Sequence, residues 1–175
     1  MDTKTRLISA AEHLFDRHGF TATGMDRLTH AAGMSSRTLY KHAGSKTALM
    51  KAVLTERDRR FLQRMDVDSV DAFFRALEDW VRDEGCRGCL FLRAHGETGG
   101  DTPEITEAVL SHKTKFYETI QRIVAIETGG MGDRELAEQI LILLEGATAA
   151  ATYRGSEAIA TARGAALALT KQALS

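Results

Sequence analysis

The sequence predicts an all-α fold, and three observations lead to this prediction. Apolar residues recur at intervals of three and four along most of the 175 residues, and no segment of useful length alternates apolar with polar residues. The single proline, Pro103, stands where it would start a helix rather than interrupt one. Hydrophobic residues make up 43% and charged residues 27%, which is the composition of an ordinary globular protein.

Three helices are expected before residue 45. The first ends at Gly19 and carries an apolar stripe formed by Leu7, Ala10, Ala11, Leu14 and Phe15. Thr23-Gly24-Met25-Asp26 has the form of a capping box, which opens a second helix that Gly33 closes. Ser35 is expected to cap a third helix from Ser36 to His42, with Leu39 as its main apolar anchor.

Six longer or more apolar helices are expected in the rest of the chain. Ser45 should cap a fourth helix that reaches about Val67, and its charged run at 56–60 should be solvated. The remaining five are expected at Val70 to Gly85, at Cys89 to His95, from Thr102-Pro103 to just before Thr128, from the cap Asp133 to Arg154, and from the cap Ser156 to the C-terminus.

Charge is distributed unevenly along the chain. Residues 1–60 hold 11 Lys and Arg against 6 Asp and Glu, a net charge of +5, whereas the remainder has a net charge of −6. A basic N-terminal region joined to an acidic remainder is typical of a protein that binds a polyanion with one part only. The two short helices joined by Ala32-Gly33-Met34-Ser35 also have the length of a helix-turn-helix, whose second helix enters the DNA major groove.

An ordered string of residues makes this prediction more specific. The string comprises Leu14-Phe15, Gly19-Phe20, Ala22-Thr23, Leu28, Ala31-Ala32-Gly33-Met34-Ser35, Thr38-Leu39-Tyr40, His42 and Ser45-Lys46. It resembles the TetR/AcrR family of repressors over about the first quarter of the chain. Two positions depart from the family pattern: Ala43 replaces an aromatic residue, and Thr29 replaces an alanine.

The resemblance implies a role for each residue of the predicted DNA-binding site: Thr23, Ser35, Ser36, Arg37, Thr38, Tyr40, Lys41, His42 and Lys46. Thr23 and the start of the second helix meet a phosphate, and Tyr40, His42 and Lys46 hold the DNA backbone. Ser36, Arg37 and Lys41 face base edges. The chemistry agrees, because an arginine offers guanine a bidentate pair of donors and a helix N-terminus attracts phosphate.

The residues after the predicted helix-turn-helix favour a ligand-binding and dimerisation domain. Domain bounds of 1–47 and 48–175 are therefore expected. The resemblance places a ligand pocket along the helix that carries His112, and the candidate pocket residues are Phe73, Trp80, Phe91, His95, His112, Phe116 and Tyr117. A core role for His112 and for the aromatic residues is the preferred interpretation, and only some of them are expected to line a cavity. The last two helices carry more apolar surface than one thin layer needs. The resemblance implies that they form a two-fold dimer interface, with Ile140, Leu144, Ala147, Ala151, Ile159 and Ala166 as candidates. Packing of both faces within one chain is the alternative.

Cys86 and Cys89 form a lone C-x-x-C pair. They supply only two of the four ligands of a structural zinc site, which His95 and His112 could complete. Simple packing of both thiols is the preferred interpretation, so neither a metal nor a cofactor is expected. No catalytic triad, phosphate-binding loop or spaced carboxylate pair stands out, and an enzyme is not expected.

The sequence thus predicts a DNA-binding transcriptional regulator: a homodimeric repressor that a small-molecule effector releases from a palindromic, double-stranded operator. No apolar run approaches the ~20 residues of a membrane span and no signal peptide is present, so the cytoplasm is the expected location. Two alternatives stay open. One is a thiol- or metal-responsive regulator that uses Cys86 and Cys89, and the other is a helical protein-interaction module that does not bind DNA.

Overall fold

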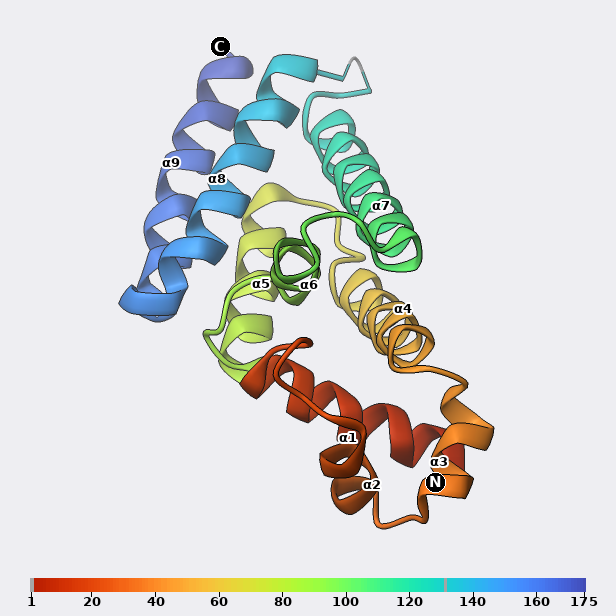
Figure 1. Ribbon diagram of the computed structural model, residues 1–175. Helices are drawn as coiled ribbons and strands as arrows, with labels where there is room; N and C mark the ends of the chain where they lie inside the picture. The colour runs from red at the N-terminus through yellow and green to blue at the C-terminus, as the bar shows by residue number, and fades with distance from the viewer. Residues whose placement is uncertain (1, 131) are drawn as a thin grey trace. The chain divides into compact units, whose positions relative to one another are not determined.

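The computed structural model describes residues 2–130 and 132–175, which form nine helices and no strand (Figure 1). The helices are α1 (Thr3–His18), α2 (Met25–Ala32), α3 (Ser36–Ala43), α4 (Lys46–Arg64), α5 (Val70–Glu84), α6 (Leu90–Glu97), α7 (Pro103–Glu127), α8 (Arg134–Arg154) and α9 (Glu157–Ala173). The all-α prediction is confirmed. Across these described residues, none of the helices has the length and apolar character needed to cross a membrane.

Residues that pack together fall into two compact units. The first comprises Met1–Arg59 and Leu90–Ser111, and the second comprises Arg60–Cys89 and His112–Ser175. Both α4 and α7 therefore contribute residues to each unit. Helix α6 packs with the N-terminal helices although about 45 residues separate it from α3. The predicted domain boundary is a single cut along the chain after residue 47, which these packing units do not test. It therefore stays a prediction.

The first unit holds its short helices through buried apolar side chains and end caps. Phe15, Leu28, Leu39 and Leu49 come from four successive helices and are almost completely buried. The Asp2 carboxylate caps α1 by accepting from the backbone N–H of Thr5 at 2.8 Å. Short helices are marginal by themselves, so this shared core supplies most of the stability of α2 and α3.

The second unit is built around α5, which buries an almost complete apolar face. Helix α5 packs against α9, and α8 lies beside α9 over its length (Figure 1). Their contacts are dominated by small and branched residues, among them Ile140, Leu144, Ile159 and Ala166. Alanines at helix contacts let the helix axes approach closely, which explains the alanine-rich sequence of α8 and α9.

Most predicted helix ends lie within a few residues of the observed ones. The differences concern one helix cap and two helix ends. Ser35, Ser45 and Asp133 cap their helices as predicted, each accepting from a backbone N–H at 3.2, 3.0 and 2.9 Å, respectively. The predicted side-chain cap at Ser156 is wrong, because this residue already has helical φ and ψ and its hydroxyl makes no cap hydrogen bond. Helix α4 ends at Arg64 rather than near Val67, and α6 begins one residue later than predicted.

Candidate DNA-binding interface

The turn between α2 and α3 is tight because Gly33 adopts a left-handed conformation with φ of 60°. A side chain at such a φ is strained, which explains the glycine. The N–H groups of Gly33 and Met34 donate back to the carbonyls of His30 and Thr29 at 3.1 and 3.3 Å and so close the end of α2. The turn places α3 directly after α2 in the arrangement of a helix-turn-helix.

Helix α3 buries one face and exposes the other. Leu39 and Ala43, one helical turn apart, are 0% and 8% exposed and point into the first unit. The predicted DNA-contacting residues Ser36, Arg37, Tyr40, Lys41 and His42 are all exposed. An amphipathic helix held by its apolar face thus presents cationic and neutral hydrogen-bond donors to solvent, which is what base and phosphate contacts require.

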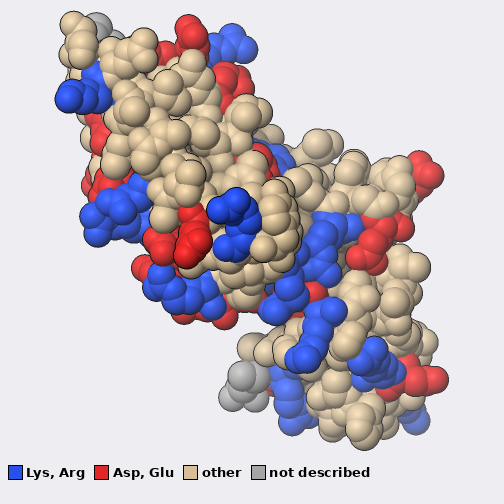
Figure 2. Space-filling view, turned by 90° about the vertical axis from the view of Figure 1, so that its left-hand side faces the viewer, with Lys and Arg blue, Asp and Glu red and all other residues tan. Residues whose placement is uncertain are grey.

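Basic side chains are well represented on the N-terminal helices. Figure 2 shows several Lys and Arg side chains, and fewer Asp and Glu, at the lower end of the view where these helices lie. The surplus agrees with the net charge of +5 over residues 1–60. Such a surface attracts a polyanion and makes its binding depend on salt.

Ser35 and Thr38 have local structural roles at the start of α3. The Ser35 hydroxyl accepts from the backbone N–H of Thr38 and lies 2.9 Å from the Thr38 hydroxyl. Ser35 remains exposed and Thr38 is half-buried. Any DNA contact by these two residues therefore competes with, or is shared with, the helix cap.

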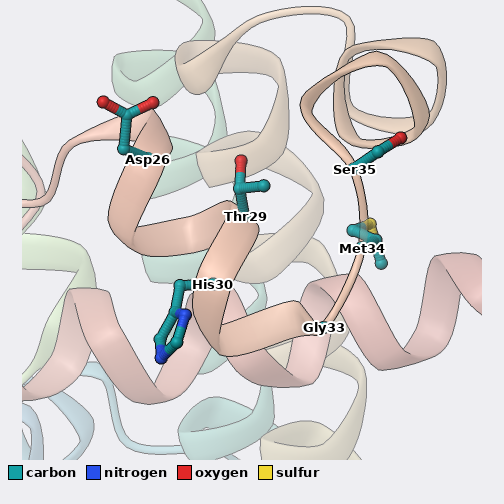
Figure 3. Close-up of a pocket in the computed structure, with 6 residues that line it drawn as sticks. All are labelled: Asp26, Thr29, His30, Gly33, Met34 and Ser35. Atoms are coloured by element: carbon teal, nitrogen blue, oxygen red, sulfur yellow. The ribbon is translucent and has the colours of Figure 1, made fainter.

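A shallow hollow of about 490 Å³ lies beside this turn. Figure 3 shows Asp26, Thr29 and His30 along α2, with Ser35 across the hollow at the start of α3. Thr29, which departs from the family pattern, donates its hydroxyl to the carbonyl of Met25 at 2.9 Å. Because this hydroxyl has a partner within its own helix, the substitution leaves the turn intact.

The α1–α2 loop differs from the capping-box prediction. Gly24, not Thr23, is the N-cap of α2, and no side chain caps this helix. Thr23 is completely buried, and its hydroxyl donates to the carbonyls of Gly19 and Leu14 at 2.6 and 3.5 Å. The Thr23 side chain therefore fastens the loop internally, and the uncapped backbone N–H groups of α2 are the groups at this end that suit a phosphate.

Lys46 is the first residue of α4 and is half-buried against the same loop. Its Nζ donates to the carbonyl of Thr21 at 3.2 Å and lies 4.6 Å from the centroid of the Phe20 ring. Burial lowers the pKa of Lys46 from its ordinary value, and the nearby Glu97 carboxylate partly opposes this shift. The ammonium has three donors, so one bond to Thr21 leaves capacity for a phosphate oxygen.

The candidate ligand-binding residues divide between the two units. Phe91 and His95 belong to the first unit, and Phe73, Trp80, His112, Phe116 and Tyr117 belong to the second. In the second unit, the rings of Trp80, His112 and Phe116 lie 5.3 to 5.4 Å from that of Phe61. Phe61 was missed by the sequence prediction, although its spacing of seven residues from Leu54 on α4 signals a buried position.

His112 and Tyr117 are the two candidate pocket residues of the second unit whose polar groups have described surroundings. His112 is 4% exposed and stacks on Phe116, with an angle of 7° between the rings. Tyr117 donates its hydroxyl to Glu138 at 2.8 Å, and this bond together with burial raises the pKa of Tyr117. In the first unit, the buried Nδ1 of His95 makes no hydrogen bond.

The structure shows where the six residues predicted for the dimer interface lie within the single chain, and their role in a dimer stays a prediction. Ile140, Leu144, Ala147, Ala151, Ile159 and Ala166 are all 5% exposed or less within the single chain and belong to its own core. Ala147 also borders an open groove between α8 and α9. The other residues that line this groove are Ile142, Leu143, Gly146, Ala150 and Arg154 of α8 and Ala158, Thr161, Ala162 and Ala165 of α9.

Both cysteines are free and half-buried. The Cys86 Sγ lies 4.0 Å from the carbonyl of Val81, and the Cys89 Sγ accepts from Lys113 Nζ at 3.7 Å. Within residues 2–130 and 132–175, no three His, Cys, Asp or Glu side chains come together as metal ligands.

These features define a helix-turn-helix DNA-binding protein, and comparison with known proteins identifies its family. A family model described as bacterial regulatory proteins, tetR family, matches residues 7–53. A second model, described as a tetracyclin repressor-like C-terminal domain, matches residues 67–166. Because this second match alone spans more than half of the chain, the protein belongs to the TetR family of DNA-binding transcriptional regulators.

Individual relatives agree with this assignment. The chain is 36% identical over 62 residues to the HTH-type transcriptional regulator UidR of Escherichia coli strain K12, a match that covers 35% of this chain and 32% of UidR. It is 26% identical over 138 residues to the regulator TcmR of Streptomyces glaucescens, covering 73% of this chain and 61% of TcmR. The matched segment thus spans about a third to two thirds of these relatives.

The fold extends over the whole chain in solved structures. A TetR-family transcriptional regulator from Streptomyces coelicolor superimposes with a TM-score of 0.84 at 25% identity, covering 99% of this chain and 96% of that one. GusR of Salmonella enterica superimposes with a TM-score of 0.73 at 22% identity, covering 97% and 95%. The family consists of regulators rather than enzymes, and its DNA-binding domain excludes the alternative of an interaction module without DNA binding.

Proposed function

We propose that this regulator is a repressor that binds a palindromic operator as a homodimer and leaves it when a small-molecule effector binds. The observation that carries the proposal is the exposed face of α3, where Arg37 and Lys41 stand beside Tyr40 and His42 while Leu39 anchors the helix. A guanidinium at this position reads guanine through two hydrogen bonds, and its neighbours hold the sugar-phosphate backbone.

The open groove between α8 and α9 supports a dimer. Ile142 on α8 is 68% exposed and lines the groove, together with small residues such as Gly146, Ala150 and Ala165. Large exposed apolar groups next to a groove of small residues suit helix packing against a second, identical surface. A two-fold dimer then presents two recognition helices to two half-sites, which is why a palindromic operator is expected.

The aromatic cluster around Phe61 supports an effector site in the second unit. Trp80, His112 and Phe116 pack on Phe61 in the core and together carry flat apolar surfaces and one buried imidazole, groups that suit a small organic molecule with at least one polar group if the cluster opens to admit it. Release of DNA requires that the effector bind the DNA-free conformation more tightly. The C-x-x-C pair supports a thiol-responsive alternative less well, because the only polar contacts described for the two thiols are Val81 and Lys113.

Selection from a random-sequence duplex library tests the operator proposal. The purified protein should enrich a sequence with two inverted half-sites about one or two helical turns apart. Binding of this selected duplex should fall steeply with salt and exceed binding of a scrambled duplex by at least about 1,000-fold. Enrichment of a single, unrepeated half-site would contradict the dimeric mode, and no enrichment would contradict sequence-specific binding.

A further inference from the structure

The last residue of α6 bonds to the loop that precedes α2. The Glu97 Oε2 accepts from the backbone N–H of Thr21 at 2.8 Å, across 76 residues of sequence. The same carboxylate lies flat against Gly19, where an added Cβ would come within 2.8 to 2.9 Å of both its oxygens. Position 19 favours glycine for two reasons: its φ of 86° strains other residues, and a Cβ would come too close to the Glu97 carboxylate.

The residue whose N–H donates to Glu97 also accepts a hydrogen bond from Lys46. The carbonyl of Thr21 accepts from Lys46 Nζ at 3.2 Å, and the adjoining Phe20 ring lies beneath the ammonium and packs on Phe15 at 5.6 Å. The charge of Glu97 acts on Lys46 as well, since it raises the pKa of the lysine against the effect of burial. Thr21 is thus fixed on its N–H side by α6 and on its carbonyl side by α4.

A second bond connects α6 to the end of α1. Arg93, one turn before Glu97, donates to the carbonyl and to the Oδ1 of Asp16 at 2.9 and 3.3 Å. The Asp16 side chain is only 6% exposed. Helix α6 therefore bonds to the chain on both sides of Gly19, where α1 ends and the loop begins.

We propose that Glu97 is a positioning residue for operator binding, which acts through Thr21 on Lys46. The inference rests on the proposed role of Lys46 as a phosphate contact. Glu97 has two separable properties: an oxygen that accepts the Thr21 N–H, and a negative charge that competes with phosphate for Lys46. Only the oxygen supports DNA binding.

Replacement of Glu97 separates these two properties. E97Q keeps a carbonyl oxygen for the Thr21 N–H and removes the charge, so this variant should bind the selected duplex at least as tightly as the parent. E97A removes both, leaves the loop without its α6 partner, and should bind about tenfold more weakly, or about 1.4 kcal/mol. The matched control is Glu118→Ala, which removes an exposed carboxylate of α7.

A double-mutant cycle with Lys46→Ala tests the route of the effect. In the Lys46→Ala background, E97A should change affinity by less than twofold, because the group that it positions is absent. Binding is measured by fluorescence anisotropy with the wild-type-selected duplex at several salt concentrations. Thermal unfolding of each variant checks that the protein remains folded.

Three results would overturn the proposal. They are parent-like affinity of E97A, an equal tenfold loss in the Lys46→Ala background, and a loss in E97Q as large as that in E97A. Failure of the parent protein to select any duplex would contradict the proposed function itself, and so differs from all three.

Discussion

Arg57 of α4 donates to Glu12 of α1 at 2.8 Å, and the two side chains are only 6% and 14% exposed. Both residues belong to the first unit, where the pair joins the long helix α4 to the helix that precedes the helix-turn-helix. Taking these charges out of water is expensive, and the bond offsets that cost only while both partners are present. The relationship therefore makes removal of one partner more harmful than removal of both.

Glu12→Ala should destabilise the protein by more than the ~1 kcal/mol of an exposed ion pair, because it removes a carboxylate that accepts from a buried guanidinium. The double variant Glu12→Leu, Arg57→Met replaces both charges with apolar groups and should recover most of that loss. Urea unfolding followed by circular dichroism measures both, with Glu118→Ala as the control. A loss below about 1 kcal/mol in the single variant would show that the pair acts as an ordinary surface contact.

The same pair shows where the sequence was informative and where it was not. The run from Glu56 to Arg60 was predicted to be solvated, and this is wrong for Arg57 and Asp58, which are 5% and 8% exposed. Local charge density cannot reveal a partner 45 residues away, and Glu12 is that partner for Arg57. Helix positions were predicted well because apolar periodicity and caps are local properties of the chain.

The features of the candidate site also differ in whether local sequence patterns could predict them. The exposed face of α3 could be predicted from the position of Leu39 and from the residues that resemble the TetR/AcrR family, because both are local features of the sequence. The burial of Thr23, the bond between Lys46 and Thr21, and the contact of Glu97 with the loop depend on tertiary packing. Periodicity identifies the apolar faces of α8 and α9, but it does not say whether the same chain or a second copy covers them.

Asp71 contributes a pH-dependent bond between α5 and α9. Its carboxylate accepts from Arg163 at 2.6 Å and from Arg75 at 2.8 Å, and the bond to Arg163 is the main reason why the pKa of Asp71 is lowered. Since the folded pKa lies below the unfolded value of about 3.9, the bond stabilises the fold fully above that value. This contribution is lost as the pH falls from about 3.9 through the folded pKa.

Asp71→Asn should therefore cost stability at pH 7 and progressively less at acid pH. The carboxylate side chain is 34% exposed, so solvent screening limits the cost to about 1 kcal/mol or less. Urea unfolding of parent and variant between pH 7 and about pH 3 measures the difference. A difference that stayed constant over this range would show that the charge of Asp71 does not carry the effect.

Ile142→Glu should convert the dimer into a monomer. Ile142 is 68% exposed beside the α8–α9 groove, so a glutamate there would be an unpaired charge buried between two copies. Dissociation should become at least about 100-fold more favourable, or about 2.7 kcal/mol. The control is Ile126→Glu, which places the same charge at a 48% exposed isoleucine of α7.

Sedimentation equilibrium over a range of concentrations checks this prediction, and thermal unfolding at high concentration shows whether each variant remains folded. Residues such as Ala147 are less suitable, because a charge at this 5% exposed position would also disrupt the core of the single chain. An unchanged dimer in the Ile142 variant would remove the groove between α8 and α9 from consideration as the interface.

Arg37 and Lys46 should affect DNA binding in different ways, because base contacts specify sequence while phosphate contacts do not. Arg37 is exposed on α3, and Arg37→Ala should cost about 1–3 kcal/mol on the selected duplex while changing the binding of scrambled DNA much less. Lys46→Ala should weaken both duplexes alike and reduce the log–log salt slope by about one unit for each phosphate that the ammonium no longer neutralises. Arg82→Ala on α5 removes an exposed arginine outside the proposed interface and serves as the control.

Titrations of both duplexes at several salt concentrations distinguish the two roles. If Arg37→Ala kept the full preference for the selected duplex, α3 would read the operator through other residues, and if Lys46→Ala kept the parent salt slope, its ammonium would serve the α1–α2 loop alone.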